Sequence, residues 1–487
     1  MRRTLIPMLL AVIAIAGCGS SSTHASHAQS VVTTELSYFP TNTPFVLTLA
    51  TNPNAGSVQS AQGLLGRFPE AALGIDALES KLGSVGLSYD GDIRPLFGNP
   101  IALGAASGTS FSASGAESEF LAVWVTKSST ALNSLISKLL RGVPATGTRD
   151  GASLYQLGSV TLAIDGATAI LGTTSSVTAA LDRHAHSAGF TSAEFATDTA
   201  GLPQSTLMEA FGSLTGVLSQ PSAAKARLVP WVAAIRGYGA AISASSSGVT
   251  FQYRLDTSGG SLNSSEVPIA AGTTPPSLAG TMPIAVGIDD PAQIVSFAEA
   301  AEQAASPSGY AKFETREASL KRKTGVDLNS LASLLTGDLI LDSDTHTTIG
   351  RVTVSDPSTA ASTLAKLATA PRGVFKSHTS VTKLAGGFYS INEPTTTLTI
   401  GVVGNQLVAG KATVAQDRAF AAEPATASTF GHGSVAFRIG LLDLLHLTLK
   451  QQPPAIIQTL LSQLGDITGW TAASPGALTG SATLAIK

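Results

Sequence analysis

Cysteine is almost absent from this sequence, because Cys18 is the only one in 487 residues. A single cysteine cannot form an intramolecular disulfide, and it cannot supply the several thiolates of a structural zinc site. If Cys18 is itself modified, no free thiol is left to act as a nucleophile. Disulfides, thiolate metal sites and cysteine catalysis are therefore excluded.

Charged residues are also scarce. They make up 13% of the chain, about half of the roughly 25% found in ordinary domains. A formal net charge of −3 and the lack of any long basic stretch argue against nucleic acid as a partner. The densest basic cluster is Lys321, Arg322 and Lys323 with Arg316 just before, and we expect it to form a solvated helix face.

Long hydrophobic runs are missing after the N-terminal segment. No stretch beyond residue 17 reaches the roughly 18 uninterrupted apolar residues of a membrane-spanning helix. At the N-terminus, Arg2 and Arg3 precede the apolar residues 5–16. That segment is too short to span a bilayer, but it has the length and flanking charge of the hydrophobic region of a signal peptide.

The apolar segment ends at Ile15, Ala16, Gly17 and Cys18, and these four residues resemble the lipobox of bacterial lipoproteins. The resemblance implies a signal peptide over residues 1–17, cleavage between Gly17 and Cys18, and acylation of Cys18 by chains such as palmitate. It further implies an extracytoplasmic protein that is lipid-anchored to the bacterial cell membrane. The alternative is an ordinary secretory signal in which Cys18 has no role.

Beyond Cys18 the sequence predicts a flexible tether over residues 18–35, followed by two domains. The remaining chain is too long for one ordinary hydrophobic core. Residues 36–256 are expected to form a first repeat unit, residues 257–278 a linker rich in Gly, Ser, Thr and Pro, and residues 279–487 a second repeat unit.

The two units are predicted to be copies of each other, because short motifs recur in the same order about 235 residues apart. The matches link Tyr155 to Tyr389, the pair Asp182 and Arg183 to Asp417 and Arg418, residues 86–101 to 325–340, and residues 248–250 to 476–478. The alternative is that chance produces such matches in a sequence rich in Ala, Ser and Thr.

Helices are expected between sets of hairpins rather than alternating with single strands. Leu132, Leu135, Ile136 and Leu139 have helical spacing in residues 128–140. Residues 223–235 predict a second amphipathic helix that is interrupted near Pro230. Asp165 and Gly166 separate two apolar runs, which is a strong hairpin signal. The pattern therefore predicts an α+β fold in which each domain is a mainly antiparallel sheet with packed helices.

The opening of the first unit, with Tyr38, Phe39, Pro40 and Pro44 before an apolar strand, resembles an uncharacterised family of exported bacterial proteins. This family belongs to the domain-of-unknown-function class and often occurs as lipoproteins or single-anchor membrane proteins. The resemblance implies export and membrane attachment. It carries no established activity and therefore supplies no catalytic residues.

No catalytic constellation is visible in the sequence. Phosphate-loop, nucleophile-elbow and zinc-helix motifs are absent or wrongly spaced, so we expect neither an enzyme nor a cofactor. The one weak candidate for a metal site is Asp342, Asp344 and His346, which on a strand would share one face. The alternative for this segment is a polar turn between two strands.

These observations favour a non-enzymatic binding or assembly module of the cell envelope, attached to the membrane by a lipid anchor. Its partner would be an envelope protein. The alternative is a carrier or sensor for a hydrophobic envelope ligand, and a hydrolase ranks third. A deep apolar cavity would favour the carrier, a flat exposed apolar patch the assembly role, and a pocket with Asp, His and Ser the enzyme.

Overall fold

The computed structural model describes residues 25–68, 77, 79–105, 120–258, 262–271, 275–280, 282–344, 346–369, 379–428, 433–443, 458 and 461–487. The predicted signal peptide, with Gly17 and Cys18, lies outside these residues. Among the helices that are described, none combines the length and the apolar character needed to cross a membrane. The expected tether, residues 18–35, is helical from Ala25 onward, in α2 (Ala25–Leu36).

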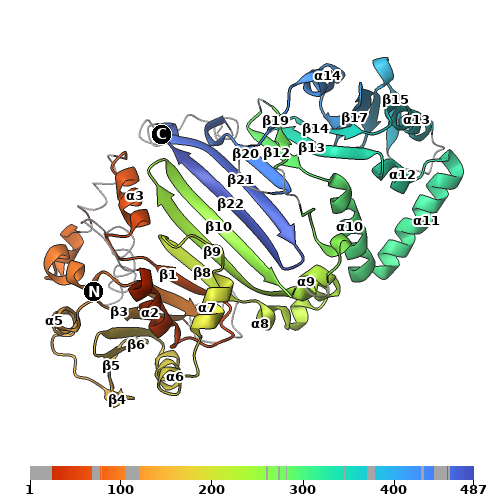
Figure 1. The fold of residues 1–487 in the computed structure, drawn as a ribbon. Helices are drawn as coiled ribbons and strands as arrows, with labels where there is room; N and C mark the ends of the chain where they lie inside the picture. Colours follow the sequence, from red (N-terminus) through yellow and green to blue (C-terminus); the bar gives the residue numbers. More distant parts are fainter. Residues whose placement is uncertain are drawn as a thin grey trace. The chain divides into compact units, whose positions relative to one another are not determined.

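The chain forms two compact units (Figure 1), and each is described by itself. The first comprises the residues up to Pro221 together with Arg236–Asp256. The second comprises Ser222–Ile235 and almost all residues from Thr257 onward. The paired strands in both units run antiparallel, and helices pack on the sheets, which confirms the predicted α+β class.

The sheet of the first unit has the strand order β4-β5-β6-β7-β3-β2-β1-β8-β9-β10. In chain order its strands are β1 (Val46–Leu49), β2 (Ile101–Ala105), β3 (Phe120–Val125), β4 (Gly147–Arg149), β5 (Ala152–Leu157), β6 (Val160–Asp165), β7 (Thr168–Gly172), β8 (Met208–Ser213), β9 (Ile235–Ser245) and β10 (Gly248–Thr257).

The second unit repeats this order with β15-β16-β17-β18-β14-β13-β12-β20-β21-β22. Its strands are β12 (Ile284–Ile288), β13 (Leu335–Ser343), β14 (Thr348–Val354), β15 (Ser380–Lys383), β16 (Tyr389–Asn392), β17 (Thr397–Val403), β18 (Gln406–Lys411), β20 (Val435–Ile439), β21 (Leu464–Ser474) and β22 (Ala477–Ile486). A separate pair joins β11 (Ser277–Leu278) to β19 (Thr426–Ala427).

Local sequence signals account for several of these elements. The Ser128 hydroxyl accepts a hydrogen bond from the Ala131 N–H and so caps α5 (Ser129–Leu139), where a helix was expected. The predicted hairpin forms where Asp165 pairs with Thr168, and Gly166 takes the positive φ of 56° that this tight turn requires. Both predictions are confirmed.

The helix expected over residues 223–235 breaks at Pro230, as predicted, but the part before the break is not an α-helix. The segment instead forms the single turns η4 (Pro221–Ala223) and η5 (Ala226–Leu228), and then the short α9 (Pro230–Ala234). Pro230 has no N–H to donate and stands at the first position of α9, so it starts a new helix and cannot continue an earlier one.

The first unit buries apolar side chains on both faces of its sheet. Leu121 and Val123 of β3 face a core that also includes side chains from α2 and from α6 (Thr174–Ala185). The neighbouring Trp124 faces the opposite side, where it packs against the cluster around Leu132 and Leu135 of α5. Alternation along each strand therefore places helices on both faces.

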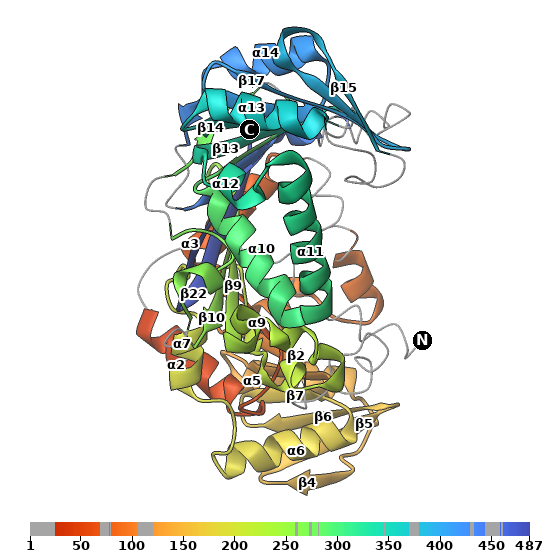
Figure 2. The same ribbon diagram turned by 90° about the vertical axis from the view of Figure 1, so that its right-hand side faces the viewer.

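In the second unit a pair of helices, α10 (Pro291–Ala305) and α11 (Pro307–Thr324), follows β12. Figure 2 shows the two helices as a hairpin. The expected linker is not structureless, because η7 (Ser264–Glu266) carries a capping box and the Gln293 side chain of α10 donates hydrogen bonds to the carbonyls of Ser264 and Val267. A two-residue turn at Gly404 and Asn405 joins β17 to β18.

Candidate functional site

The three residues singled out for a metal site do not share a strand face. Asp342 is buried on β13, and its Oδ2 accepts a hydrogen bond from the Met282 N–H. Asp344 lies in the turn after β13, where its Oδ1 accepts hydrogen bonds from the N–H groups of His346 and Thr347, both at 2.6 Å. The segment is therefore the polar turn that was the alternative expectation. Within the described residues, no group of three or more His, Cys, Asp or Glu side chains is placed to hold a metal ion.

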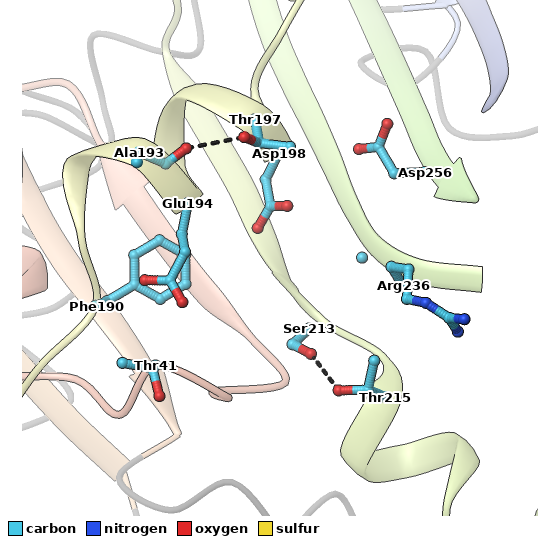
Figure 3. A pocket seen from close by; sticks show the side chains of 11 residues that line it. Thr41, Phe190, Ala193, Glu194, Thr197, Asp198, Ser213, Thr215, Arg236 and Asp256 are labelled. Carbon is cyan, nitrogen blue, oxygen red and sulfur yellow. Dashed lines mark hydrogen bonds between the residues drawn. The ribbon is translucent and has the colours of Figure 1, made fainter. Parts of the chain in front are cut away.

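The first unit contains a cleft that no sequence motif indicated (Figure 3). It has a volume of about 360 Å³ and lies among α7 (Ser192–Asp198), β9 and the end of β10. Eight of the eleven residues that line it have polar or charged side chains. The lining consists of Thr41, Phe190, Ala193, Glu194, Thr197, Asp198, Ser213, Thr215, Arg236, Gly237 and Asp256. This volume is at the lower end of the range for small-molecule sites.

Helix α7 forms because its first turn carries a complete capping box. The Thr191 hydroxyl accepts a hydrogen bond from the Glu194 N–H, and the Glu194 carboxylate accepts one from the Thr191 N–H at 2.8 Å. The cap fixes the start of the helix and holds Glu194 at the rim of the cleft. The helix ends at Asp198, and the carboxyl group of Asp198 therefore lies in the same cleft as that of Glu194 (Figure 3).

Two glycines of β9 allow the end of α7 to lie directly on the strand. A Cβ at position 239 would come within 2.0 Å of the Asp198 carbonyl oxygen, a contact that side chains do not make. A Cβ at position 237 would lie 3.0 Å from Asp198 Oδ1. Gly237 and Gly239 are two residues apart and so face the same side of the strand. They leave the room that the Asp198 carboxyl occupies.

Asp256 at the end of β10 supplies the third carboxylate of the cleft. Its Oδ1 accepts a hydrogen bond from Arg254 Nε at 2.6 Å, whereas Oδ2 is buried and has no hydrogen-bond partner within the described residues. Arg236 is exposed at the edge of the cleft and is its one lining cation. Carboxylates therefore outnumber cations on the cleft wall.

Asp198 is the carboxyl with the most unusual environment. Desolvation by burial, and then the negative charges of Asp256 and Glu194, raise its pKa to about 7. The part of the chain that the structure describes provides this carboxyl with no ion pair and no side-chain hydrogen bond. A partly buried acid without a partner, in a cleft, is a typical feature of a functional site.

The apolar floor of the cleft holds this arrangement in place. Phe190 is buried, and its ring centroid lies 5.6 Å from that of Phe211 on β8. Phe195 of α7 packs edge-on against the same ring at 5.0 Å. On the open side, the hydroxyls of Ser213 and Thr215 lie 2.7 Å apart and are hydrogen-bonded (Figure 3). Packed aromatic rings therefore form the closed side of the cleft, and hydroxyl groups line its open side.

A Ser–His contact occurs elsewhere in the first unit, but it does not form a catalytic pair. Ser37 Oγ lies 2.5 Å from His184 Nδ1 and donates its proton to the Thr34 carbonyl at 2.6 Å. His184 Nδ1–H is then the donor to the serine, which is the reverse of a general base. The imidazole also stacks on Tyr38 with a centroid distance of 4.2 Å. The contact therefore joins α2 to α6, and neither residue lines the cleft.

The cleft was missed because its residues come from five segments that are far apart in the sequence, and none belongs to a recognised motif. Two local signals point toward it in retrospect. Thr191 and Glu194 have the spacing of a capping box, and Gly237 and Gly239 mark a strand that another backbone approaches closely. Neither signal identifies Asp198 or Asp256 as the carboxyls that meet there.

Comparison with known proteins adds little to this geometry. No family model matches the chain, and no curated protein matches it. Among solved structures, crystal forms III, I and IV of TP0453 are similar at 14%, 12% and 13% identity, each with a TM-score of 0.26. They cover 47% of this chain and 82%, 81% and 83% of their own length. A likeness at this level carries no conclusion about function.

Proposed function

We propose that this chain is an extracytoplasmic lipoprotein, anchored to the cell membrane through Cys18, whose first unit binds a small ligand that carries a positive charge. The anchor rests on the lipobox sequence alone. The ligand site rests on the cleft beside α7. The role is that of a binding module, since neither the sequence motifs nor the cleft lining supply a nucleophile with an adjacent base.

The observation that carries the binding role is the Asp198 carboxyl. Its desolvation is unfavourable to folding, and no cation of the described chain offsets it. An ammonium or guanidinium group in the cleft would supply the missing charge and hydrogen-bond donors. Glu194 and Asp256 add negative charge on either side of this position, which further favours a cationic ligand.

A hydrophobic ligand fits this cleft less well. Phe190 is the one aromatic side chain among the described lining residues. Four of the eleven lining residues carry ionisable groups, namely Glu194, Asp198, Arg236 and Asp256. Burying these groups under an apolar molecule would cost desolvation free energy without new hydrogen bonds. We therefore place the carrier of a hydrophobic ligand second.

The shared strand order also supports the proposal that the two units are copies of one ancestral unit. The register places Phe211 opposite Gly239 and Ser213 opposite Gly237 in the first unit. In the second unit Phe437 stands opposite Gly469 and Ile439 opposite Ile467. Ile467 therefore occupies the position of Gly237 and would fill the space that Asp198 needs. On this proposal the second unit does not reproduce the cleft.

Calorimetric titration of the full chain with small amines and guanidines tests the binding role. Neutral and anionic molecules of similar size serve as ligand controls. Asp198→Asn should abolish binding of the cations, while Asp90→Asn, which removes a carboxylate from an exposed surface of the same unit, should not change it. Equal binding of cationic, neutral and anionic molecules, or binding of the cations by Asp198→Asn, would disprove the site. Native mass spectrometry of the membrane-extracted protein would then show whether another ligand is bound.

A further inference from the structure

Helix α11 carries its charges on two different sides. With 3.6 residues per turn, Lys312, Arg316 and Lys323 project within an arc of about 40°. We call these three residues the basic stripe. All three are exposed, and none makes an ion pair with the described part of the chain. By contrast, Lys321 lies outside the stripe and pairs with Asp327 at 2.6 Å.

The acidic residues of α11 lie away from the basic stripe. Glu314 and Glu317 project more than about 90° from its centre, on the side of Tyr310. Desolvation, followed by the negative charges of Glu314, Glu299 and Glu317, raises the pKa of Tyr310. The two glutamates share their side of the helix with Lys321, whereas the basic stripe carries cations only.

An exposed aromatic residue borders the basic stripe. Phe313 is 39% exposed and projects about 60° from Arg316. Its ring lies 6.2 Å from that of Tyr310, centroid to centroid. Leu320 is the one buried residue of this 18-residue helix, so α11 packs against α10 but leaves most of its side chains exposed to solvent. Exposed cations attract anionic headgroups, and an exposed aromatic ring next to them can enter the boundary between headgroups and acyl chains.

We propose that the basic stripe and Phe313 form a docking surface for a bilayer that contains anionic lipid. Each cation would approach a phosphate headgroup, and the Phe313 ring would enter the boundary between headgroups and acyl chains. Charge complementarity favours an anionic partner. A bilayer is favoured over a soluble polyanion because Phe313 gains from an apolar phase and because the Cys18 anchor would hold the protein at a membrane.

The test must be independent of the lipid anchor, so it uses the full chain with Cys18→Ala. Binding is measured by sedimentation with vesicles of phosphatidylcholine alone and of phosphatidylcholine mixed with phosphatidylglycerol. We expect binding to the anionic vesicles only, and weaker binding at high salt. Replacing all three stripe residues by Gln should weaken it by about fivefold per cation, on the order of 100-fold in total.

The matched control removes three other exposed cations, Lys81, Lys127 and Arg141, also by replacement with Gln. This variant carries the same net charge and should bind like the parent. Phe313→Ser should weaken binding to vesicles but leave binding to soluble polyphosphate unchanged. Equal loss in both triple variants, equal binding to neutral vesicles, or no vesicle binding at all would overturn the proposal. Polyphosphate binding as tight as vesicle binding, with no effect of Phe313→Ser, would assign the stripe to a soluble polyanion instead.

Discussion

The carboxyl group of Glu35 is fully buried, and its Oε1 accepts a hydrogen bond from the backbone N–H of Val125 at 3.0 Å. Glu35 lies near the end of α2 and Val125 at the end of β3, so this bond ties α2 to the sheet. The second oxygen, Oε2, is buried with no partner within the described residues. Burial raises the pKa of Glu35 well above its usual value, and the Val125 hydrogen bond offsets this only in part.

Glu35→Gln should make the protein more stable at alkaline pH and nearly unchanged at acid pH. Because the pKa of Glu35 is raised in the folded state, its stabilising contribution is present below the unfolded-state pKa and is lost as pH rises toward the folded-state pKa. Each pH unit in that interval costs about 1.4 kcal/mol. Thermal melts across pH measure the effect, with the exposed Glu79→Gln as control. A constant difference at all pH values would contradict it.

Asp92 should show the opposite dependence. Its Oδ1 accepts a hydrogen bond from Lys138 Nζ at 2.5 Å and its Oδ2 one from the Ser88 N–H at 2.9 Å. The hydrogen bond from Lys138 lowers the pKa of Asp92 most, and the hydrogen bond from Ser88 lowers it further. The stability they contribute is present at neutral pH and is lost as pH falls through the folded-state pKa.

We therefore expect Lys138→Met to cost on the order of 1 kcal/mol in the free energy of unfolding at neutral pH, since it leaves a buried carboxylate with one donor fewer. The cost should shrink in acid, where Asp92 is protonated in both proteins. Urea unfolding at neutral and acid pH measures it, and Lys81→Met is the matched exposed control. A cost that is the same in acid would show that lost packing, rather than charge, is responsible.

Asp198→Asn should stabilise the protein while it abolishes ligand binding. The pKa of Asp198 is raised to about 7, so the stability of the folded state falls as pH rises from the usual aspartate value through 7, and the Asn variant avoids this loss. Melting temperatures should be equal near pH 4 and higher for the variant near pH 8. Such a gain is typical of a residue kept for function rather than for folding. A variant that is less stable at pH 8 would make Asp198 a structural residue.

The sequence predicted those parts of the fold that depend on local signals. The helix that follows Ser128 and the tight turn at Gly166 each depend on residues within a few positions of one another, and both form as expected. The cleft depends instead on the approach of α7 to β9, which brings Asp198 and Asp256 together although 58 positions separate them in the sequence. The same reason explains Asp342, whose burial is set by the segment around Gly280 rather than by its neighbours on the strand.

Membrane attachment through Cys18 can be separated from attachment through α11 by variants at each place. On our proposals, Cys18→Ala should move most of the protein from the membrane to the soluble fraction, because acyl chains contribute about 0.8 kcal/mol per buried methylene. The remaining membrane-bound protein should be released by a high-salt wash, since the basic stripe binds through charge.

The Gln variant of the basic stripe should give the reverse pattern in cells. With Cys18 intact it should stay on the membrane through a high-salt wash, and combined with Cys18→Ala it should be soluble without any wash. Fractionation followed by immunoblotting distinguishes these outcomes, and the Lys81, Lys127 and Arg141 control variant should behave like the parent. Cys18→Ala protein that resists the salt wash would show that the anchor lies elsewhere. The lipobox would then have to be read as part of an ordinary secretory signal.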